Sequence, residues 1–181
     1  MNPTLTPRSE RIKSIPFSVS ETIKPHTLTI RKTPAEVFAF CRNFENLPFF
    51  LQDIDQVKVL SFQQAKWIVK PKRGPMIEWI TQITDEESNE FIAWQSLQGS
   101  EILSSGSITF RKAPLDLGTE VSLILDYRIQ DEPTLELAAH FLERDFEELS
   151  FTELRRLKAY LETGEIPTIQ GQTSARDSSL H

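Results

Sequence analysis

The side chains of this sequence that could donate or accept a proton inside a fold are few. Tyr127 lies on the apolar side of a strongly alternating segment, where its phenol could act as a donor to a bound molecule. The nearest hydroxyls predicted beside it are those of Thr81 and Ser107, and neither is a good base at neutral pH. The sequence therefore shows no convincing acid–base pair. A core tyrosine satisfied by backbone or water is the alternative interpretation of Tyr127.

Most other ionisable residues fit a solvated surface better than a catalytic site. Asp126 and Arg128 share the outer face of their predicted strand and are expected to form a solvated pair. His140 lies almost opposite the apolar stripe of its predicted helix, so it should face solvent or a rim. Three basic residues gather at a predicted hairpin tip, where they could contact an anionic group or simply face water: Lys70, Lys72 and Arg73.

The composition excludes several classes of function. Among 181 residues, 20 basic and 26 acidic side chains give a formal charge of -6, which argues against a general attraction to nucleic acid. The single cysteine, Cys41, allows no internal disulfide, and three scattered histidines form no metal-ligand motif. No apolar run reaches the ~18 residues of a membrane span, and the first residues lack the apolar core of a signal peptide. We therefore predict a cytoplasmic protein with no metal and no other cofactor.

The elements that must position these residues begin after a loose N-terminal arm, predicted at residues 1–21 from its Pro, Ser and Thr content. A strand is predicted at residues 26–31, where apolar and polar side chains alternate. Thr33, Pro34 and Glu36 then form the signature of a capped helix start. The apolar residues that follow predict two short helices, the first ending near residue 43 and the second near residue 51.

From about residue 55 to residue 130 the apolar residues recur with a period of two, which predicts strands. Short connections separate six such segments, so we expect an antiparallel meander. The alternation is clearest over residues 121–129, where every second side chain is apolar or aromatic. This last strand carries Tyr127 on its apolar face.

The last predicted element is a long amphipathic helix from about Pro133 to Thr163, with Gly164 as its C-cap. At roughly 30 residues it would be ~45 Å long and would need an extended partner surface. A curved sheet that pairs its first strand with its last could supply that surface, while the two short helices close one end. Residues 166–181 are polar with little periodicity and are predicted to form a tail.

One helix would not fill the concave face of such a sheet, so we expect an apolar cavity that could hold a small ligand. The alternative is that the same residues form a plain core, and the orientation of Trp94 is left open. Phe49 and Phe50 look exposed in the second short helix and are candidate residues of the cavity mouth. Ten residues are predicted to line the cavity: Trp67, Val69, Ile77, Trp79, Thr81, Leu123, Leu125, Tyr127, Leu142 and Phe146.

Eight short stretches follow one another at fitting spacing: TPAEVFAF (33–40), NFENLPFF (43–50), WIVK (67–70), IEW (77–79), IAWQSL (92–97), GSITF (106–110), GTEV (118–121) and LETGEIPT (161–168). Together they resemble the START-like superfamily, also called SRPBCC or birch-pollen-allergen-like, and within it the bacterial polyketide cyclase/dehydrase and lipid-transport branch. The resemblance covers about residues 22–168. It implies an α+β helix-grip fold over residues 22–165. In this fold a curved antiparallel sheet of about seven strands wraps round a long C-terminal helix, with two short helices between strands 1 and 2.

The resemblance implies a cavity for a hydrophobic molecule such as a lipid, a quinone or a polyketide. Because no acid–base pair is visible, we favour binding or carriage of that molecule over catalysis. Two alternatives stay open: a polyketide cyclase or dehydratase, and a protein-interaction module without a ligand. The expected partner is a hydrophobic small molecule and not nucleic acid. A transient membrane contact and the oligomeric state are left open.

Overall fold

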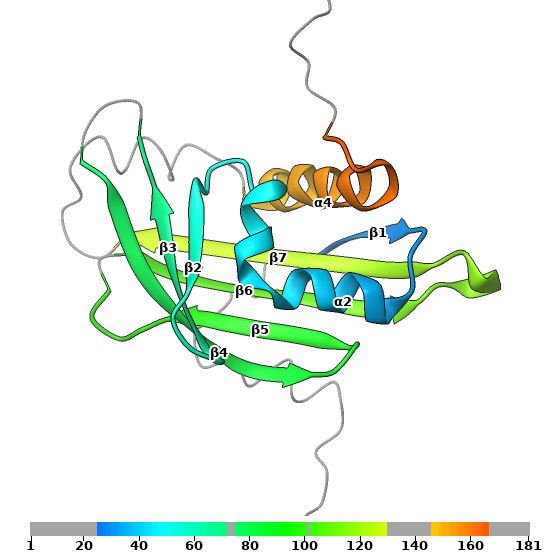
Figure 1. The fold of residues 1–181 in the computed structure, drawn as a ribbon, viewed down its shortest axis with the longest axis horizontal. Helices are drawn as coiled ribbons and strands as arrows, with labels where there is room; N and C mark the ends of the chain where they lie inside the picture. Colours follow the sequence, from blue (N-terminus) through cyan, green and yellow to red (C-terminus); the bar gives the residue numbers. More distant parts are fainter. Residues whose placement is uncertain (1–24, 72–74, 101, 130–145, 167–181) are drawn as a thin grey trace, which may run out of the picture.

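A computed structural model describes residues 25–71, 75–100, 102–129 and 146–166 of the chain, and its architecture is one antiparallel sheet with helices on one side (Figure 1). The seven strands are ordered β1-β7-β6-β5-β4-β3-β2, so the first strand pairs with the last. This confirms both the six-strand meander and its closure by the N-terminal strand. The strands are β1 (His26–Ile30), β2 (Gln56–Val59), β3 (Gln64–Val69), β4 (Ile77–Glu87), β5 (Phe91–Ser96), β6 (Ile102–Lys112) and β7 (Thr119–Ile129).

The helices cover different parts of the sheet. The helix α4 (Phe146–Thr163) packs against β1 and β7, whereas α2 (Pro34–Arg42) packs against β6. The 3₁₀ helix η2 (Phe44–Phe49) lies against β2, and a second 3₁₀ turn, η3 (Pro114–Asp116), connects β6 to β7. The sheet curves around these elements (Figure 1). The α+β helix-grip fold is therefore confirmed.

The start of α2 follows the predicted capping signature. The Glu36 backbone N–H donates to Thr33 Oγ1 at 3.3 Å, and the Thr33 backbone N–H donates to Glu36 Oε2 at 2.8 Å. Pro34 occupies the first turn of α2, where a backbone N–H would have no partner within the helix, so the lack of this N–H costs no hydrogen bond. These local bonds satisfy amide groups that a helix start would otherwise leave open.

The second short helix is a 3₁₀ helix and ends at Phe49, earlier than the predicted end near residue 51. Asn43 caps it, because its Oδ1 accepts the Glu45 backbone N–H at 3.3 Å. Pro48 lies inside the element and has no N–H to donate. A short 3₁₀ segment tolerates this loss better than a regular α-helix would.

The helix α4 ends at Thr163, as predicted, and Gly164 adopts φ +77° directly after it. The Gly164 backbone N–H donates to the Tyr160 carbonyl at 2.8 Å and closes the last turn. Within α4, the side chains of Leu154 and Leu157 are fully buried. Its predicted first half, from Pro133 to residue 145, lies outside the described residues. So do the predicted arm at residues 1–21 and nearly all of the predicted tail.

Charged side chains bind the backbone at both edges of the sheet. At the β2 edge, the Val59 backbone N–H donates to Glu45 Oε1 at 3.3 Å. At the β1 edge, Lys158 Nζ donates to the Thr29 carbonyl, and Glu162 accepts the backbone N–H of the residue that follows β1, Arg31, at 2.8 Å. The helical segments are thus attached to the edge strands as well as packed over the sheet.

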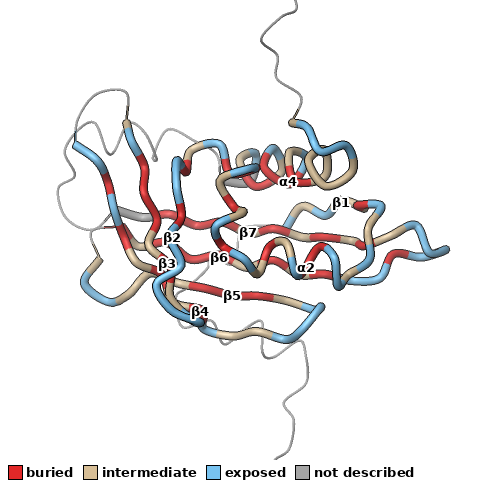
Figure 2. The backbone as a smooth tube through the Cα atoms, in the orientation of Figure 1, coloured by how far each residue is buried: buried red, intermediate tan, exposed pale blue. Residues whose placement is uncertain are grey.

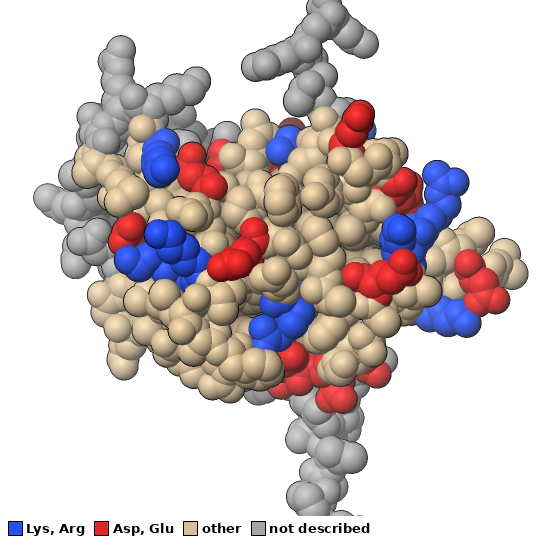
Figure 3. All heavy atoms as spheres, viewed as in Figure 1, with Lys and Arg blue, Asp and Glu red and all other residues tan. Residues whose placement is uncertain are grey.

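Acidic and basic side chains are interspersed on the face shown in Figure 3, where neither red nor blue forms one large patch. Among the described residues, no helix is both long and apolar enough to cross a membrane. In the same part of the chain, His, Cys, Asp and Glu side chains form no group of three that could hold a metal ion.

Candidate functional site

The concave face of the sheet carries the buried side chains that the alternation predicted. Eight of the ten predicted lining residues are described, and all eight are buried (Figure 2): Trp67, Val69, Ile77, Trp79, Thr81, Leu123, Leu125 and Tyr127. Leu142 lies outside the described residues. Phe146 begins α4, but its side chain is also outside them. The structure therefore brings the strand-borne residues together on one face.

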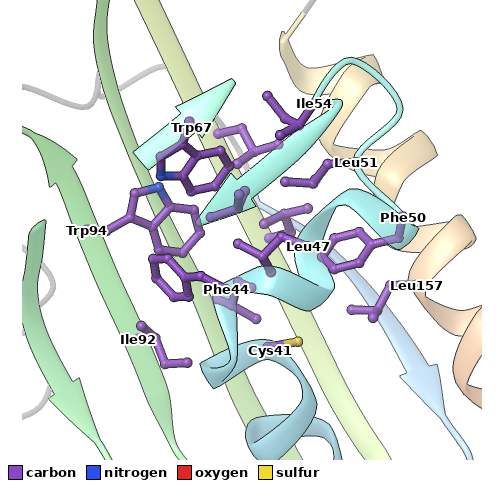
Figure 4. Close-up of a cluster of buried hydrophobic side chains, with 14 of the residues drawn as sticks. Cys41, Phe44, Leu47, Phe50, Leu51, Ile54, Trp67, Ile92, Trp94 and Leu157 are labelled. Atoms are coloured by element: carbon purple, nitrogen blue, oxygen red, sulfur yellow. The ribbon is translucent and has the colours of Figure 1, made fainter. Parts of the chain in front are cut away.

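Four rings form a packed group on this face, which we call the aromatic cluster: Phe44, Trp67, Trp79 and Trp94. Trp67 stacks between Trp79, at a centroid distance of 5.9 Å, and Trp94, at 6.2 Å. Phe44 from η2 meets Trp67 and Trp94 edge-on at 6.0 and 5.5 Å (Figure 4). Trp94 is only 2% exposed, which settles its orientation: it points into the core.

Gly106 makes room for Trp94. The two residues lie directly opposite each other on β5 and β6. A Cβ atom placed on Gly106 would lie 2.3 Å from Trp94 Cζ2 and 2.6 Å from Cε2, far inside contact distance. The indole therefore fills the space that a side chain at position 106 would need, and this part of the concave face is closed by packing.

The indole N–H groups are satisfied inside the sheet. Trp67 Nε1 donates to Thr81 Oγ1 at 2.7 Å, and Trp79 Nε1 donates to Ser104 Oγ at 2.9 Å. The Thr81 hydroxyl, which was predicted to lie beside Tyr127, thus accepts the hydrogen bond of the Trp67 indole. These buried bonds hold the rings in place and leave their apolar faces to packing.

Ser107 does not face Tyr127, and this prediction was wrong. Ser107 pairs with Ile124 on the other face of the sheet, whereas Ser104 lies directly opposite Tyr127. Ser104 is 3% exposed and points inward with Ile102 and Gly106. Counting in steps of two from buried Ile108 would have identified Ser104, because strand side chains alternate strictly between faces.

Tyr127 lies at the edge of the aromatic cluster. Its ring meets Trp79 edge-on at 6.3 Å, and the residue is 6% exposed. Burial raises the pKa of the Tyr127 phenol, and the negative charges of Glu153 and Asp53 raise it further. The phenol is therefore protonated at neutral pH and can act as a hydrogen-bond donor.

Glu153 is a buried carboxylate that the sequence interpretation missed. It is 2% exposed and comes from α4. Its position continues the row Leu149, Leu157 and Leu161 at steps of four, so an acidic residue occupies a place on the packed stripe of the helix. A charged residue in an apolar row is the signal that could have identified it, because such residues are rarely buried without a partner.

The Glu153 carboxylate links α4 to the chain that leaves η2. Oε1 accepts the Gln52 backbone N–H at 3.1 Å, and Oε2 lies 3.3 Å from Arg156 Nε. Arg156 Nε also donates to the Phe50 carbonyl at 2.8 Å. These bonds fix the carboxylate between the helix and the η2–β2 connection, which also carries Asp53. We call Ser104, Tyr127, Glu153 and Asp53 the polar site.

Phe49 and Phe50 differ in environment. Phe49 is 50% exposed and stacks on Tyr160 of α4 at 5.2 Å, whereas Phe50 is fully buried in the core. The predicted exposure is therefore correct for Phe49 and wrong for Phe50, which follows the 3₁₀ helix as its C-cap and is packed into the core. The role of these residues at a cavity mouth stays a prediction.

The predicted solvated pair of Asp126 and Arg128 is wrong for Asp126, which is only 4% exposed. Its cross-strand neighbour Ser105 is 2% exposed, so the convex face is covered at this point. Alternation tells which face a residue occupies but not whether that face meets water. The side chain of Arg128 lies outside the described residues, as do His140, Lys72 and Arg73.

One small pocket is lined entirely by described residues. It has a volume of about 10 Å³ and lies between Arg42, Phe44 and the β2–β3 turn. Arg42 Nε donates to Glu86 Oε2 at 2.7 Å beside it. That volume holds about one water molecule, so this pocket is too small for an organic ligand.

Comparison with known proteins identifies relatives of this fold. A family profile described as "Polyketide cyclase / dehydrase and lipid transport" matches residues 30–152, more than half of the chain. No curated protein is significantly similar to the chain.

Solved structures extend the comparison. One protein from Deinococcus radiodurans is 29% identical, with a TM-score of 0.62 over 78% of this chain and 97% of its own. One from Thermus thermophilus is 16% identical, with a TM-score of 0.58 over 78% of this chain and 97% of its own. An aromatase/cyclase from a Streptomyces species is 18% identical, with a TM-score of 0.58 over 77% of this chain and 92% of its own. The last two likenesses show a shared fold alone.

Proposed function

The chain belongs to the polyketide cyclase/dehydrase and lipid transport family, and we propose that it binds and carries a hydrophobic small molecule on the concave face between the sheet and α4. The observation that carries this proposal is the polar site. A protonated phenol, Tyr127, lies on a mostly apolar face, and a buried carboxylate, Glu153, comes from the helix that packs against the same strand. Ligand sites commonly combine apolar walls with a few polar groups that orient the bound molecule.

Differences in side-chain packing across the concave face favour one part of it as the location of this molecule. The aromatic cluster is tightly packed by Phe44 and by the fit of Trp94 over Gly106, which favours a ligand position outside it. Beyond Trp79 the inward side chains are smaller aliphatic residues beside Tyr127, namely Val69, Ile77, Ile102 and Leu125. An apolar molecule placed over these residues would bring its polar group to Tyr127.

The proposal is tested on protein purified under gentle conditions from its own host. Native mass spectrometry should show a bound apolar molecule that denaturation releases. Tryptophan fluorescence should also change on titration with lipids or quinones, because Trp79 contacts Tyr127. Protein that carries no such molecule and responds to none of these compounds would contradict the proposal.

A second candidate, a cyclase or dehydratase, is favoured by the same pair of side chains. Tyr127 could donate a proton to a substrate oxygen while the Glu153 carboxylate accepts one, which is the acid–base arrangement that this chemistry needs. With a polyketide-like substrate, Tyr127→Phe should then abolish turnover without loss of folding. Unchanged turnover in the folded variant would exclude this mechanism.

A further inference from the structure

The convex face of the sheet is buried at positions that no described element covers. Asp126 of β7 and Ser105 of β6 lie opposite each other on this face and are only 4% and 2% exposed. Ala93 of β5 lies on the same face and is 3% exposed. The described helices all lie on the other, concave side of the sheet (Figure 1). The burial of this face therefore has a source outside the described helices and strands.

Asp126 indicates the chemistry that the covering segment must have. β1 pairs with β7 only as far as Leu123, so among the described strands β6 alone flanks Asp126. An aspartate at such an open position of a strand would ordinarily face water. Carboxylates are rarely buried without a partner, because the loss of hydration is costly unless a cation or several hydrogen-bond donors replace it. A segment that covers Asp126 should therefore bring basic side chains to it.

Three longer segments lie outside the described residues, and their charges differ. Residues 1–24 carry four basic and two acidic side chains, residues 130–145 one basic and five acidic, and residues 167–181 one of each. The first of these segments thus has the charge that complements a buried carboxylate. Its basic residues are Arg8, Arg11, Lys13 and Lys24. Residues 72–74 also carry positive charge, but they join β3 to β4, and β5 and β6 lie between these strands and β7.

Residues 1–24 also arrive at the right place on the sheet. They lead into β1, and continuing its antiparallel register outward from the pair His26–Leu123 would bring residue 23 beside Asp126. An extended chain spans about 3.3 Å per residue, whereas crossing from β7 to β5 takes only about 10 Å. The segment is therefore long enough to continue from the β1 edge across several strands of the convex face.

We propose that residues 1–24 cross the convex face over β7, β6 and β5 and place a basic side chain beside Asp126. The apolar residues of this segment alternate over Ile15, Phe17 and Val19, so an extended chain turns all three to one side and can pack them on the sheet. The convex face is then an interaction surface whose partner is the chain's own N-terminal segment. This inference concerns the face opposite the proposed ligand and stands independently of the proposed function.

The test measures the protection of one engineered thiol in the full-length chain. Ser105→Cys is nearly isosteric, and the native Cys41 is fully buried. The thiol at position 105 should react with a maleimide at least about tenfold more slowly than the thiol of Thr84→Cys, because Thr84 is exposed on β4. Ser107→Cys repeats the measurement at a neighbouring position of the convex face.

The charges of the segment are tested next. Replacing Arg8, Arg11 and Lys13 together by Gln should raise the reaction rate at position 105 by at least about fivefold, because breaking a buried ion pair is costly. Asp126→Asn should raise it in the same way. Combined with the triple replacement, Asp126→Asn should add no further increase, since both changes remove the same interaction.

The apolar contact and the controls use the same readout. Phe17→Ser should also raise the reaction rate at position 105, through the loss of apolar packing. Glu10→Gln combined with Glu21→Gln is the matched control, because it removes charges of the opposite sign from the same segment and should leave the protection unchanged. Circular dichroism and an unreactive Cys41 confirm that each variant is folded.

Three results would overturn the proposal. A thiol at position 105 that reacts as fast as one at position 84 would show that nothing covers the face. Protection that survives both the triple replacement and Phe17→Ser would assign the cover to another part of the chain. Protection that increases with protein concentration would assign it to a second copy of the chain.

Discussion

In the aromatic cluster, Trp67, Trp94 and Phe44 pack ring against ring, whereas in the polar site Tyr127 and Ser104 share the face with a buried carboxylate from α4. The two regions are close neighbours, because Trp79 stacks on Trp67 and meets Tyr127 edge-on. Every indole N–H bond described in the cluster stays within the sheet. The polar site instead places ionisable groups on the same face. Packing thus dominates one region, whereas buried polar groups characterise the other.

This difference separates stability from specificity. Changes in the aromatic cluster should lower the free energy of unfolding strongly, because they create cavities or clashes in a close-packed core. Changes in the polar site should alter ligand binding more than stability. Four predictions test this division, beginning with the largest expected effect.

Trp67→Ala should have the largest effect on stability. It removes a 1% exposed indole that contacts three other rings, and it leaves Thr81 Oγ1 without its donor. Replacing a buried Trp by Ala typically costs about 3–5 kcal/mol. Urea unfolding followed by circular dichroism measures the change. Phe62→Ala is the control, because Phe62 is 79% exposed and should lose no more than about 1 kcal/mol. Equal losses in the two variants would contradict a closed cluster.

Gly106→Ala should destabilise the protein by about 1–3 kcal/mol, the usual range for overpacking a core. The added methyl group would clash with Trp94 Cζ2. Trp94→Phe removes the outer ring atoms involved in this clash, so adding Gly106→Ala to that variant should cost clearly less than it costs in the native protein. A double-mutant cycle measures this coupling. Purely additive free energies would show that Gly106 is needed for another reason.

Tyr127→Phe should change the stability at neutral pH by about 1 kcal/mol or less, because the ring that contacts Trp79 is retained. The affinity for the bound apolar molecule should fall by about tenfold through loss of the donor. Unfolding and binding experiments on the same preparation compare the two effects. A large loss of stability with unchanged binding would assign Tyr127 to the structural core.

The smallest effect concerns alkaline pH. The folded-state pKa of Tyr127 lies above its unfolded value of about 10 because of burial, so its stabilising contribution is complete below pH 10 and declines as the pH rises further. Phenylalanine has no such titration. The stability difference between the native protein and Tyr127→Phe should therefore shrink above pH 10. Buried Cys41, whose pKa is also raised by burial, titrates in both proteins and cancels in the difference. A constant difference from pH 8 to pH 11 would contradict this result.

Local signals in the sequence predicted most of the fold. The capping residues Thr33 and Glu36 act within four residues, and the strand alternation needs only neighbouring positions, so both could be interpreted from one sequence. The closure of the sheet by β1 and β7 followed from the resemblance and from the need to cover a long helix. The structure confirms these predictions.

The polar site was harder to predict because it depends on contacts between distant segments. Ser104 requires the correct phase of β6, and an error of one residue moves every side chain to the other face. Glu153 and Gln52 are separated by about a hundred positions and meet only through the docking of α4. The burial of Asp126 depends on coverage of the convex face, about which strand periodicity contains no information.

The charged residues at the sheet edges have a consequence for self-association. An open edge strand offers unpaired backbone groups to which a strand from another molecule can add, and this is a common route to aggregation. Here Glu45 accepts the hydrogen bond of the Val59 backbone N–H at one edge, while Lys158 donates a hydrogen bond to the Thr29 carbonyl at the other. A strand added from another molecule would have to displace a charged side chain at each of these positions. The same helical segments that enclose the concave face thereby also oppose fibril-like growth of the sheet.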